Sequence, residues 1–324
     1  MPEGHSVHRI AAQFRLHFAG KQVHVSSPQG RFGDCVLLDG HTVTDAYAVG
    51  KHLFVAFDTG DSLHVHLGIY GAWDFAGNVA LDDTAATAGG RMGQTAGRGT
   101  VVGAHEDSLS SIGAPRRTRV RMGESESASG ASAEFPPAPI GQVRVRILSD
   151  DAVADLRGPT VCEVLSVDGV ARVRGDLGPD PLVDTKNGEE RFIARCRSTS
   201  TPVGCALMNQ KIVAGIGNVY RAEMLFRAKL SPFAVTRDLP EVTLRELWRD
   251  WVRLLGIGVK TGQMLTMDGM STAQKRAALA NREDRHWVYK RTDQPCRICG
   301  TPIRMEMMEA RKLYFCPRCQ GVSG

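Results

Sequence analysis

The stretch that decides the fold of this chain is residues 210–226, QKIVAGIGNVYRAEMLF. A glycine-rich turn, KIVAGIGN, separates two segments whose apolar residues recur at helical spacing. Asn218 ends that turn where the second helix begins, so its amide and the backbone N–H groups of the first turn can bind an anion such as a phosphate. A plain helix cap would use the same residue type, and that interpretation stays open.

The sequence on both sides of this stretch is also helical. Apolar residues keep helical spacing in ERFIARCR (190–197), PVGCALMNQ (202–210), VYRAEMLFRAKL (219–230) and TLRELWRDWVRLLGIGVK (243–260). We therefore predict an α-helical bundle that occupies residues 173–288.

The last part of the chain, residues 289–324, holds two closely spaced cysteine pairs, CRIC and CPRC. The residues between them can form a β-hairpin that places Cys296, Cys299, Cys316 and Cys319 around one Zn²⁺ ion at about 2.3 Å. Four protein ligands leave no position for water, so the pattern predicts a structural zinc ion. The remaining cysteines are scattered and are interpreted as small buried hydrophobes: Cys35, Cys162, Cys196 and Cys205.

Residues 1–172 show a different pattern, in which helical spacing over residues 6–18 gives way to short β-branched runs. The runs are VHVSS (23–27), CVLLD (35–39), HLFVAF (52–57), SLHVHLG (62–68), QVRVRIL (142–148) and AVADL (152–156). They predict an antiparallel β-sandwich. Residues 80–139 are rich in Gly, Ala, Ser and Thr and lack periodicity, which indicates a flexible insertion.

Composition narrows the classes of partner. The 324 residues carry a net charge of +5 and a pI near 8.8, which permits a polyanionic partner without requiring one. No apolar run reaches the roughly 18 residues of a membrane helix, and the start MPEGHSVHR lacks the layout of a secretory signal. We expect a cytosolic protein with no membrane partner.

The first residues, MPEG, offer a nucleophile. Once Met1 is removed, Pro2 provides a secondary amine whose pKa, like that of other terminal amines, lies near ~8. In its neutral form such an amine can attack C1′ of a deoxyribose, displace the base and leave an iminium that permits elimination of the phosphate. Glu3 is placed to donate and accept the protons that open the sugar ring. The alternative is a proline in the first turn of an ordinary helix.

Five segments together carry a resemblance to a known family: MPEG, GKHLF, HLGIYG, QKIVAGIGNVYRAEMLF and RKLYFCPRCQ. In this order, spanning nearly the whole chain, they resemble the formamidopyrimidine-DNA glycosylase and endonuclease VIII superfamily. The resemblance implies an α+β multidomain fold with an N-terminal β-sandwich and flanking helices, a helix-two-turn-helix domain and a zinc-finger β-hairpin, with DNA in the cleft between. It also implies a bifunctional DNA glycosylase and abasic-site lyase of base excision repair. We expect a monomer whose partner is damaged DNA, duplex or single-stranded.

The resemblance assigns roles in the β-sandwich domain. Pro2 and Glu3 match the nucleophile and the proton-transfer group, and Lys51 in GKHLF matches a hairpin lysine that binds phosphate near the lesion and assists the proline. A solvated turn lysine is the alternative interpretation of Lys51.

Three further residues of this domain lie in HLGIYG. His66 matches a phosphate-contacting histidine, although His64 and His66 can also be two strand residues on one face with no ligand. Ile69 and Tyr70 stand at the position of the family's wedge, which fills the gap that an extruded nucleotide leaves.

The resemblance also assigns three DNA-binding residues to the C-terminal half. Asn218 matches a phosphate-binding residue at a helix start. Glu223 matches a carboxylate that supports the region of the terminal amine, with a surface helix charge as the alternative. Arg311 precedes Cys316 as the family's zinc-finger arginine does, and on a hairpin tip it can hold two phosphates that flank the extruded nucleotide.

The segment GIYGAW is more similar to endonuclease VIII than to the purine-directed branch, so we expect oxidised pyrimidines as substrates and strand cleavage by β,δ-elimination. Two features depart from the family pattern. Relatives commonly have a glutamate where this chain has Ser6, which can cap the helix but cannot act as an acid. The insertion at residues 80–139 replaces a shorter loop that carries further wedge residues.

Three alternatives to the bifunctional enzyme remain. One is an abasic-site lyase with weak glycosylase activity. Another is a non-catalytic protein that binds damaged DNA on the same scaffold. The third is a zinc-ribbon RNA-binding or transcription factor, which would leave Pro2 and Lys51 unexplained.

Overall fold

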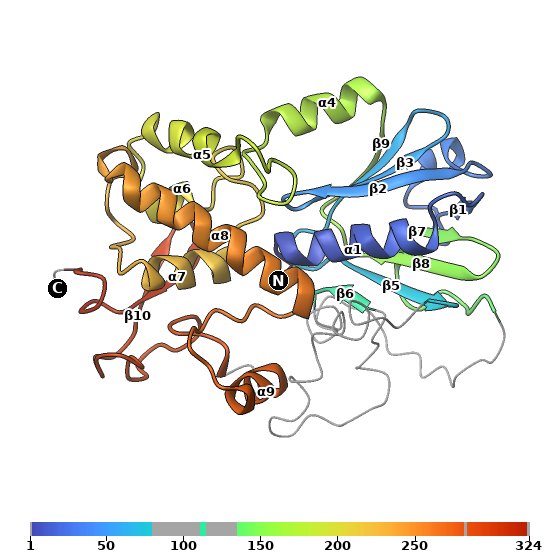
Figure 1. Ribbon diagram of the computed structural model, residues 1–324. Coiled ribbons are helices and arrows are strands. Elements are labelled where there is room, and N and C mark those ends of the chain that lie inside the picture. The colour runs from blue at the N-terminus through green and yellow to red at the C-terminus, as the bar shows by residue number, and fades with distance from the viewer. Residues whose placement is uncertain (1, 80–110, 115–134, 282–283, 323–324) are drawn as a thin grey trace. The chain divides into compact units, whose positions relative to one another are not determined.

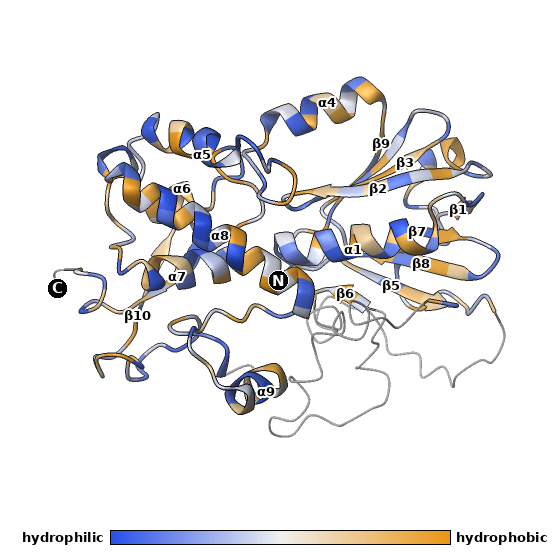
Figure 2. Ribbon diagram, in the orientation of Figure 1, coloured by the Kyte–Doolittle hydropathy of each residue, from blue (hydrophilic) through white to orange (hydrophobic). Residues whose placement is uncertain are grey.

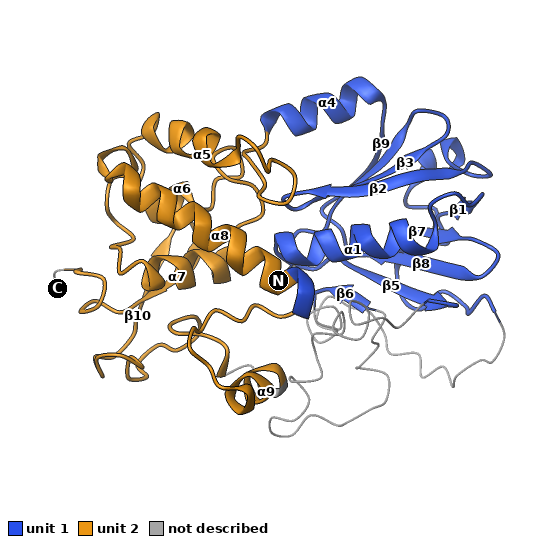
Figure 3. Ribbon diagram, in the orientation of Figure 1, with its two compact units in different colours: residues 1–91, 100–176, 259–262 blue, residues 92–99, 177–258, 263–324 orange. Residues whose placement is uncertain are grey.

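The computed structural model describes residues 2–79, 111–114, 135–281 and 284–322. They form two compact units (Figure 3), of which unit 1 lies within residues 1–176 together with 259–262, and unit 2 within 177–258 and 263–324. The chain enters unit 2 after Asp176, whereas the sequence placed the boundary after residue 172, because helix α4 (Val167–Asp176) continues to the later position. The cysteine-rich segment groups with the helices of unit 2.

Unit 1 is a sandwich of two antiparallel sheets with helices (Figure 1). The larger sheet has the order β1-β7-β8-β5-β6 and the smaller sheet the order β2-β3-β4-β9. The bounds are β1 His24–Ser26, β2 Val43–Val49, β3 His52–Phe57, β4 Ser62–His66, β5 Ala72–Gly77, β6 Ser111–Gly113, β7 Val143–Leu148, β8 Ala152–Arg157 and β9 Val161–Leu165.

Helix α1 (Gly4–His17) contributes to the same hydrophobic core as both sheets. Phe14 packs edge-on against Trp73 at a ring-centroid distance of 4.8 Å and is fully buried. The helix begins two residues before the predicted start because Glu3 is the N-cap. The expectation that Ser6 caps the helix is wrong, since its hydroxyl lies in the first turn and pairs with the His5 ring at 3.2 Å.

Two predictions for unit 1 need correction. The run CVLLD is a 3₁₀ helix, η1 (Gly33–Leu37), in which Val36 is 72% exposed, because its apolar residues do not alternate as a half-buried strand requires. The segment predicted as a structureless insertion contains β6, which pairs with β5 and buries Ile112 in the core. Of that insertion, residues 80–110 and 115–134 lie outside the described residues.

Unit 2 is helical with a terminal hairpin, as the sequence predicts. The bounds are α5 Gly188–Arg197, α6 Val203–Ala206, α7 Asn218–Arg227, η2 Thr236–Asp238, α8 Glu241–Thr261, α9 Thr272–Ala280, β10 Arg304–Met308 and β11 Arg311–Phe315, with the last residues of α8 assigned to unit 1. Hydrophobic and hydrophilic residues alternate along α8 (Figure 2), and Leu244, Leu247 and Trp251 on its apolar face are buried.

Helix α7 lies in the interior of unit 2. Every residue from Asn218 to Phe226 is buried, which explains why the segment is apolar on nearly all sides. Tyr220 packs edge-on against Trp251 at a centroid distance of 4.8 Å. Val219 and Phe226 share a core cluster with the cysteine hairpin. Among the described helices, none is long and apolar enough to cross a membrane.

Candidate active site and DNA-contacting residues

The amino-terminal end of α1 holds a buried carboxyl group beside Pro2. Pro2 is buried, and Glu3 is 0% exposed with an extended backbone (φ −127°, ψ 178°) and no capping bond from its side chain. His5 follows in the first turn, where burial and the positive charge of Arg9 lower its pKa to about 3. The fold thus withdraws Glu3 from water at the start of the chain, next to the residue whose amine the sequence predicts as nucleophile.

Lys51 lies at the tip of the β2–β3 hairpin. The register pairs Val49 with His52, so Gly50 and Lys51 form a two-residue turn. Gly50 has φ +60°, the left-handed conformation that a type II′ hairpin turn requires at its first position. Lys51 is half-buried at this turn.

His66 ends β4 with a defined ring orientation. Its Nδ1 accepts a hydrogen bond from the backbone N–H of Gly68 at 3.1 Å, so the ring proton belongs on Nε2. Burial, then the charges of Lys51 and His64, lower the pKa of His66 to about 4. At neutral pH the ring is therefore an uncharged Nε2–H donor, which suits a contact to a phosphate oxygen.

The turn after β4 exposes two large side chains, Ile69 and Tyr70, which are 45% and 39% exposed. Both glycines of HLGIYG are required because neighbouring atoms leave no room for a Cβ at either position. A Cβ on Gly68 would lie 1.8 Å from Oγ1 of Thr160, and one on Gly71 would lie 2.4 Å from the carbonyl oxygen of Leu67. The backbone of the turn is therefore tightly packed, and it presents two large side chains, as a wedge would need.

In unit 2, Asn218 is the first residue of α7, and the N-cap is Gly217. The interpretation of Asn218 as a plain helix cap is therefore wrong. Its amide Nδ2 donates to the carbonyl oxygen of Lys312 at 2.8 Å, and its Oδ1 accepts from Arg221 at 2.5 Å. The side chain is thus tied to β11, and Arg221, which sequence reasoning missed, fixes its orientation.

Glu223 lies in the interior of unit 2. It is 0% exposed, so a surface helix charge is wrong, and its carboxylate is committed to the protein interior. Oε1 accepts from the backbone N–H groups of Val288 and Tyr289 at 2.9 and 2.8 Å, and Oε2 accepts from that of Trp287 at 2.8 Å and from the Thr266 hydroxyl at 2.5 Å. Since these donors occupy both oxygens, Glu223 anchors the segment before the cysteine hairpin.

Arg311 begins β11 at the tip of the β10–β11 hairpin, opposite Met308. The two turn residues, Glu309 and Ala310, have φ of +50° and +57°, as a type I′ turn requires. Arg311 and Lys312 are both exposed, so the tip presents two cationic side chains in sequence. This placement is compatible with the predicted contact to phosphates.

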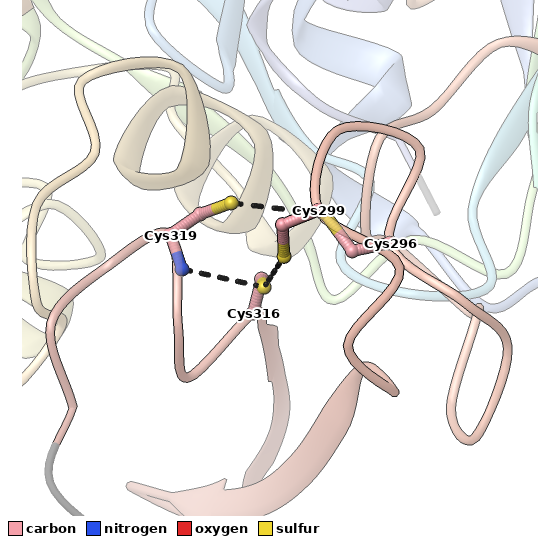
Figure 4. Close-up of side chains that lie close together, drawn as sticks. All are labelled: Cys296, Cys299, Cys316 and Cys319. Carbon is pink, nitrogen blue, oxygen red and sulfur yellow. Dashed lines mark hydrogen bonds between the residues drawn. The ribbon is translucent and has the colours of Figure 1, made fainter.

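The four cysteines of the hairpin meet in space (Figure 4). Their sulfur atoms all lie within 4.8 Å of one another, with Cys296–Cys319 at 3.9 Å and Cys299–Cys316 at 3.5 Å. A tetrahedron with 2.3 Å Zn–S bonds has edges of about 3.8 Å, so the four residues fit one zinc ion. The backbone N–H of Cys319 points at the sulfur of Cys316 at 3.4 Å, a contact that stabilises a thiolate.

Three family models match the chain in the order in which its parts occur. The formamidopyrimidine-DNA glycosylase N-terminal domain matches residues 1–105, the formamidopyrimidine-DNA glycosylase H2TH domain residues 177–269, and the zinc finger found in FPG and IleRS residues 293–322. A β-sandwich, an H2TH domain and a four-cysteine hairpin define the class of zinc-finger DNA glycosylases.

Curated relatives identify the family. The protein called Endonuclease 8 1 of Mycobacterium tuberculosis H37Rv is 35% identical over 321 residues, which cover 99% of this chain and 100% of the relative. The formamidopyrimidine-DNA glycosylase of Thermus thermophilus is 36% identical over 145 residues, which cover 45% of this chain and 54% of that protein. The chain belongs to the formamidopyrimidine-DNA glycosylase and endonuclease VIII superfamily. This membership implies a DNA glycosylase of base excision repair.

Solved structures show the same fold. Lactococcus lactis formamidopyrimidine-DNA glycosylase, non-covalently bound to DNA that contains an abasic site, matches with a TM-score of 0.67 at 19% identity, covering 98% of this chain and 99% of that one. The MutM (Fpg) protein of Thermus thermophilus matches with a TM-score of 0.64 at 22% identity over the whole of both chains.

Proposed function

We propose that this chain is a bifunctional DNA glycosylase and abasic-site lyase that excises oxidised bases, pyrimidines preferentially, through a Schiff base at Pro2. The observation that carries the proposal is the fully buried carboxyl group of Glu3 beside Pro2 at the start of α1. Burying a carboxyl group is costly, and such groups in proteins are commonly found where they transfer protons.

The chemistry follows from the amine. After removal of Met1, the lone pair of the neutral Pro2 nitrogen forms a bond to C1′ while the bond to the damaged base breaks, and the base leaves with a proton. Glu3 exchanges protons with the sugar ring oxygen, which opens the ring and gives an iminium. Loss of the C2′ proton expels the 3′ phosphate, a second elimination expels the 5′ phosphate, and water then releases Pro2.

The other site residues are proposed to hold the DNA. Lys51 at its hairpin tip and His66 as an uncharged donor would contact phosphates near the lesion, and Arg311 would contact them from the zinc-finger hairpin. Ile69 and Tyr70 would fill the gap in the base stack. A zinc ion held by the four cysteines would keep the hairpin folded, and it takes no part in the bond changes.

Two features support a preference for oxidised pyrimidines. The segment after β4 reads GIYGAW, which is similar to endonuclease VIII, and a relative matching the whole chain carries the name Endonuclease 8 1. We expect cleavage of oligonucleotides with thymine glycol or dihydrouracil to exceed cleavage of those with 8-oxoguanine. The reverse order of rates would contradict the lesion preference but would not contradict the role of Pro2 as nucleophile.

The nucleophile is tested by blocking it. A protein with an uncleavable N-terminal tag should bind abasic-site DNA but neither cut it nor form a borohydride-trapped adduct, and Pro2→Gly should also lose cleavage. The matched control carries the same tag at the C-terminus and should cut normally. Cleavage by the N-terminally tagged protein would disprove the role of Pro2.

Glu3→Gln separates the two activities. It should lose base excision while keeping more of its cleavage at a preformed abasic site, because no base has to be displaced there. Cleavage by the wild type at abasic sites alone would indicate a lyase with weak glycosylase activity. Binding without any trapped adduct would indicate a non-catalytic protein.

A further inference from the structure

A row of rings lies on one face of the smaller sheet of unit 1. Cross-strand pairing places His52 opposite His66, and Phe54 opposite both Tyr47 and His64. The alternate residues of the same strands, such as Leu53, Val55 and Val65, point to the other face and belong to the hydrophobic core. The rings therefore lie on the sheet face away from the main core.

These rings form one continuous stack across three strands. Tyr47 stacks on Phe54 at a centroid distance of 5.3 Å, Phe54 on His64 at 4.9 Å, and His64 on His52 at 5.1 Å with only 9° between the planes. His52 in turn contacts the His66 ring at 4.9 Å. His52 thus connects two residues of the site, because it directly follows Lys51 in the chain and packs on the ring of His66.

Hydrogen bonds run along the same row and have a defined direction. Nδ1 of His64 lies 2.8 Å from Oε1 of Glu163, and since a carboxylate only accepts, Nδ1 carries the proton. Nδ1 of His52 lies 2.8 Å from Nε2 of His64, and when His64 carries only its Nδ1 proton, Nδ1 of His52 is the donor. The hydrogen bonds therefore run from His52 to His64 and from His64 to Glu163.

We propose that His52, His64 and Glu163 are positioning residues that hold the Lys51 turn and the His66 ring in place for strand cleavage. This inference rests on the proposed function of Lys51 and His66. A wrongly oriented His52 ring would allow the turn that carries Lys51 to swivel and would remove the surface on which His66 packs. Because Glu163 comes from β9, the far end of the row is held by a strand distant in sequence from β3.

Burial lowers the pKa of His52 to about 3, with smaller contributions from His66, His64 and Lys51, so this ring carries a single proton at neutral pH. His66 carries its proton on Nε2, the opposite tautomer, because its Nδ1 accepts from Gly68.

The first test uses Glu163, whose side chain is 47% exposed and therefore tolerates substitution. In the wild type, ¹⁵N NMR of the histidine rings should show protonated Nδ1 for His52 and His64. E163Q keeps an acceptor oxygen and should preserve this pattern. E163L removes the acceptor, so the proton of His64 should move to Nε2 and that of His52 should move to Nε2 as well, two hydrogen bonds away from the mutation. Protonated Nε2 at His52 in the wild type, or an unchanged pattern in E163L, would overturn the chain.

The second test measures cleavage of abasic-site DNA. H52N places an amide N–H where His52 has Nδ1–H, whereas H52L has a similar volume and no donor. We expect H52L to cleave at least about tenfold more slowly, since small displacements of catalytic groups can cost up to ~100-fold, and H52N to stay within about threefold of the wild type. Equal rates in the two variants would overturn the positioning role.

The two tests distinguish this inference from the proposed function. Ring tautomers are read on the free protein and need no activity. A wild-type protein with the expected tautomers but no cleavage would refute the function, whereas full cleavage by H52L would refute only the positioning role. Thermal midpoints and zinc content of each variant, compared with the wild type, show whether a slow variant is folded.

Discussion

Glu223 offers the sharpest test of how unit 2 is held together. Its buried carboxylate accepts three backbone N–H groups from residues 287–289 and the hydroxyl of Thr266. The substitution Glu223→Gln keeps the shape of the side chain and removes its charge. It also turns one acceptor oxygen into an NH₂ group. We expect this change to destabilise unit 2 substantially.

The magnitude follows from the individual contacts. If the amide oxygen takes the position of Oε1, it still accepts from Val288 and Tyr289, but without charge each bond weakens by about 1 kcal/mol. The NH₂ group then faces the N–H of Trp287, which loses its partner at a cost of about 1–3 kcal/mol. Thr266 can adapt, since its hydroxyl can turn to the carbonyl oxygen of Arg285, 3.0 Å away. Burial raises the pKa of Glu223, so removing the charge returns part of the loss. We therefore expect Glu223→Gln to lower the free energy of unfolding by about 3 kcal/mol.

Urea unfolding followed by tryptophan fluorescence measures this effect. Of the four tryptophans in the chain, Trp248, Trp251 and Trp287 lie in unit 2, so the signal is dominated by the relevant part. The control is Glu246→Gln on α8, an exposed glutamate that should change stability by less than about 0.5 kcal/mol. If the free energies of unfolding of Glu223→Gln and of the control differ by less than about 1 kcal/mol, the carboxylate does not anchor residues 287–289 as we infer.

Three further outcomes are expected. Arg311→Ala should weaken DNA binding by about 1–3 kcal/mol and lower the dependence of affinity on salt, whereas Arg304→Ala at the other end of the hairpin should do neither. A chelator that removes zinc should unfold the hairpin and lower DNA affinity, and circular dichroism with a binding assay would detect both losses. Folding lowers the pKa of His52 and His66 from 6.5 to about 3 and 4, so below pH 6.5 the unfolded chain binds more protons than the folded one. The contribution of the two histidines to the free energy of unfolding should therefore be complete above pH 6.5 and should decrease from there towards pH 4. Urea midpoints that do not change between pH 7 and pH 5 would contradict this last expectation.

Several features of the site were predictable because they depend on residues close together in the chain. The cysteine pairs are recognised by their spacing, since each tight turn supplies a zinc ion with two ligands that have two residues between them. The buried helix α7 follows from its apolar sequence. The roles proposed for Pro2 and Glu3 rest on their identity and position at the start of the chain.

Other features depend on partners far along the chain, and a local pattern does not contain them. Nothing in the sequence near Glu223 distinguishes a surface charge from a buried anchor, because the groups that bind it begin 43 residues later. Asn218 reads as a helix cap until β11 supplies the carbonyl of Lys312, 94 residues away. The strand β6 is hidden for the same reason, since only its pairing with β5 makes three residues of a polar segment into part of a sheet.

By itself, the sequence determined the order of the parts and the four cysteines that fit a zinc ion, because each depends on residue type and short spacing. Only the tertiary structure decided which polar groups face one another, and therefore which carboxylate is an anchor and which histidine nitrogens lie within hydrogen-bonding distance of each other. His64 and Glu163 are 99 residues apart and meet only when β4 pairs with β9, and the hydrogen bond between them is what gives the ring chain its direction.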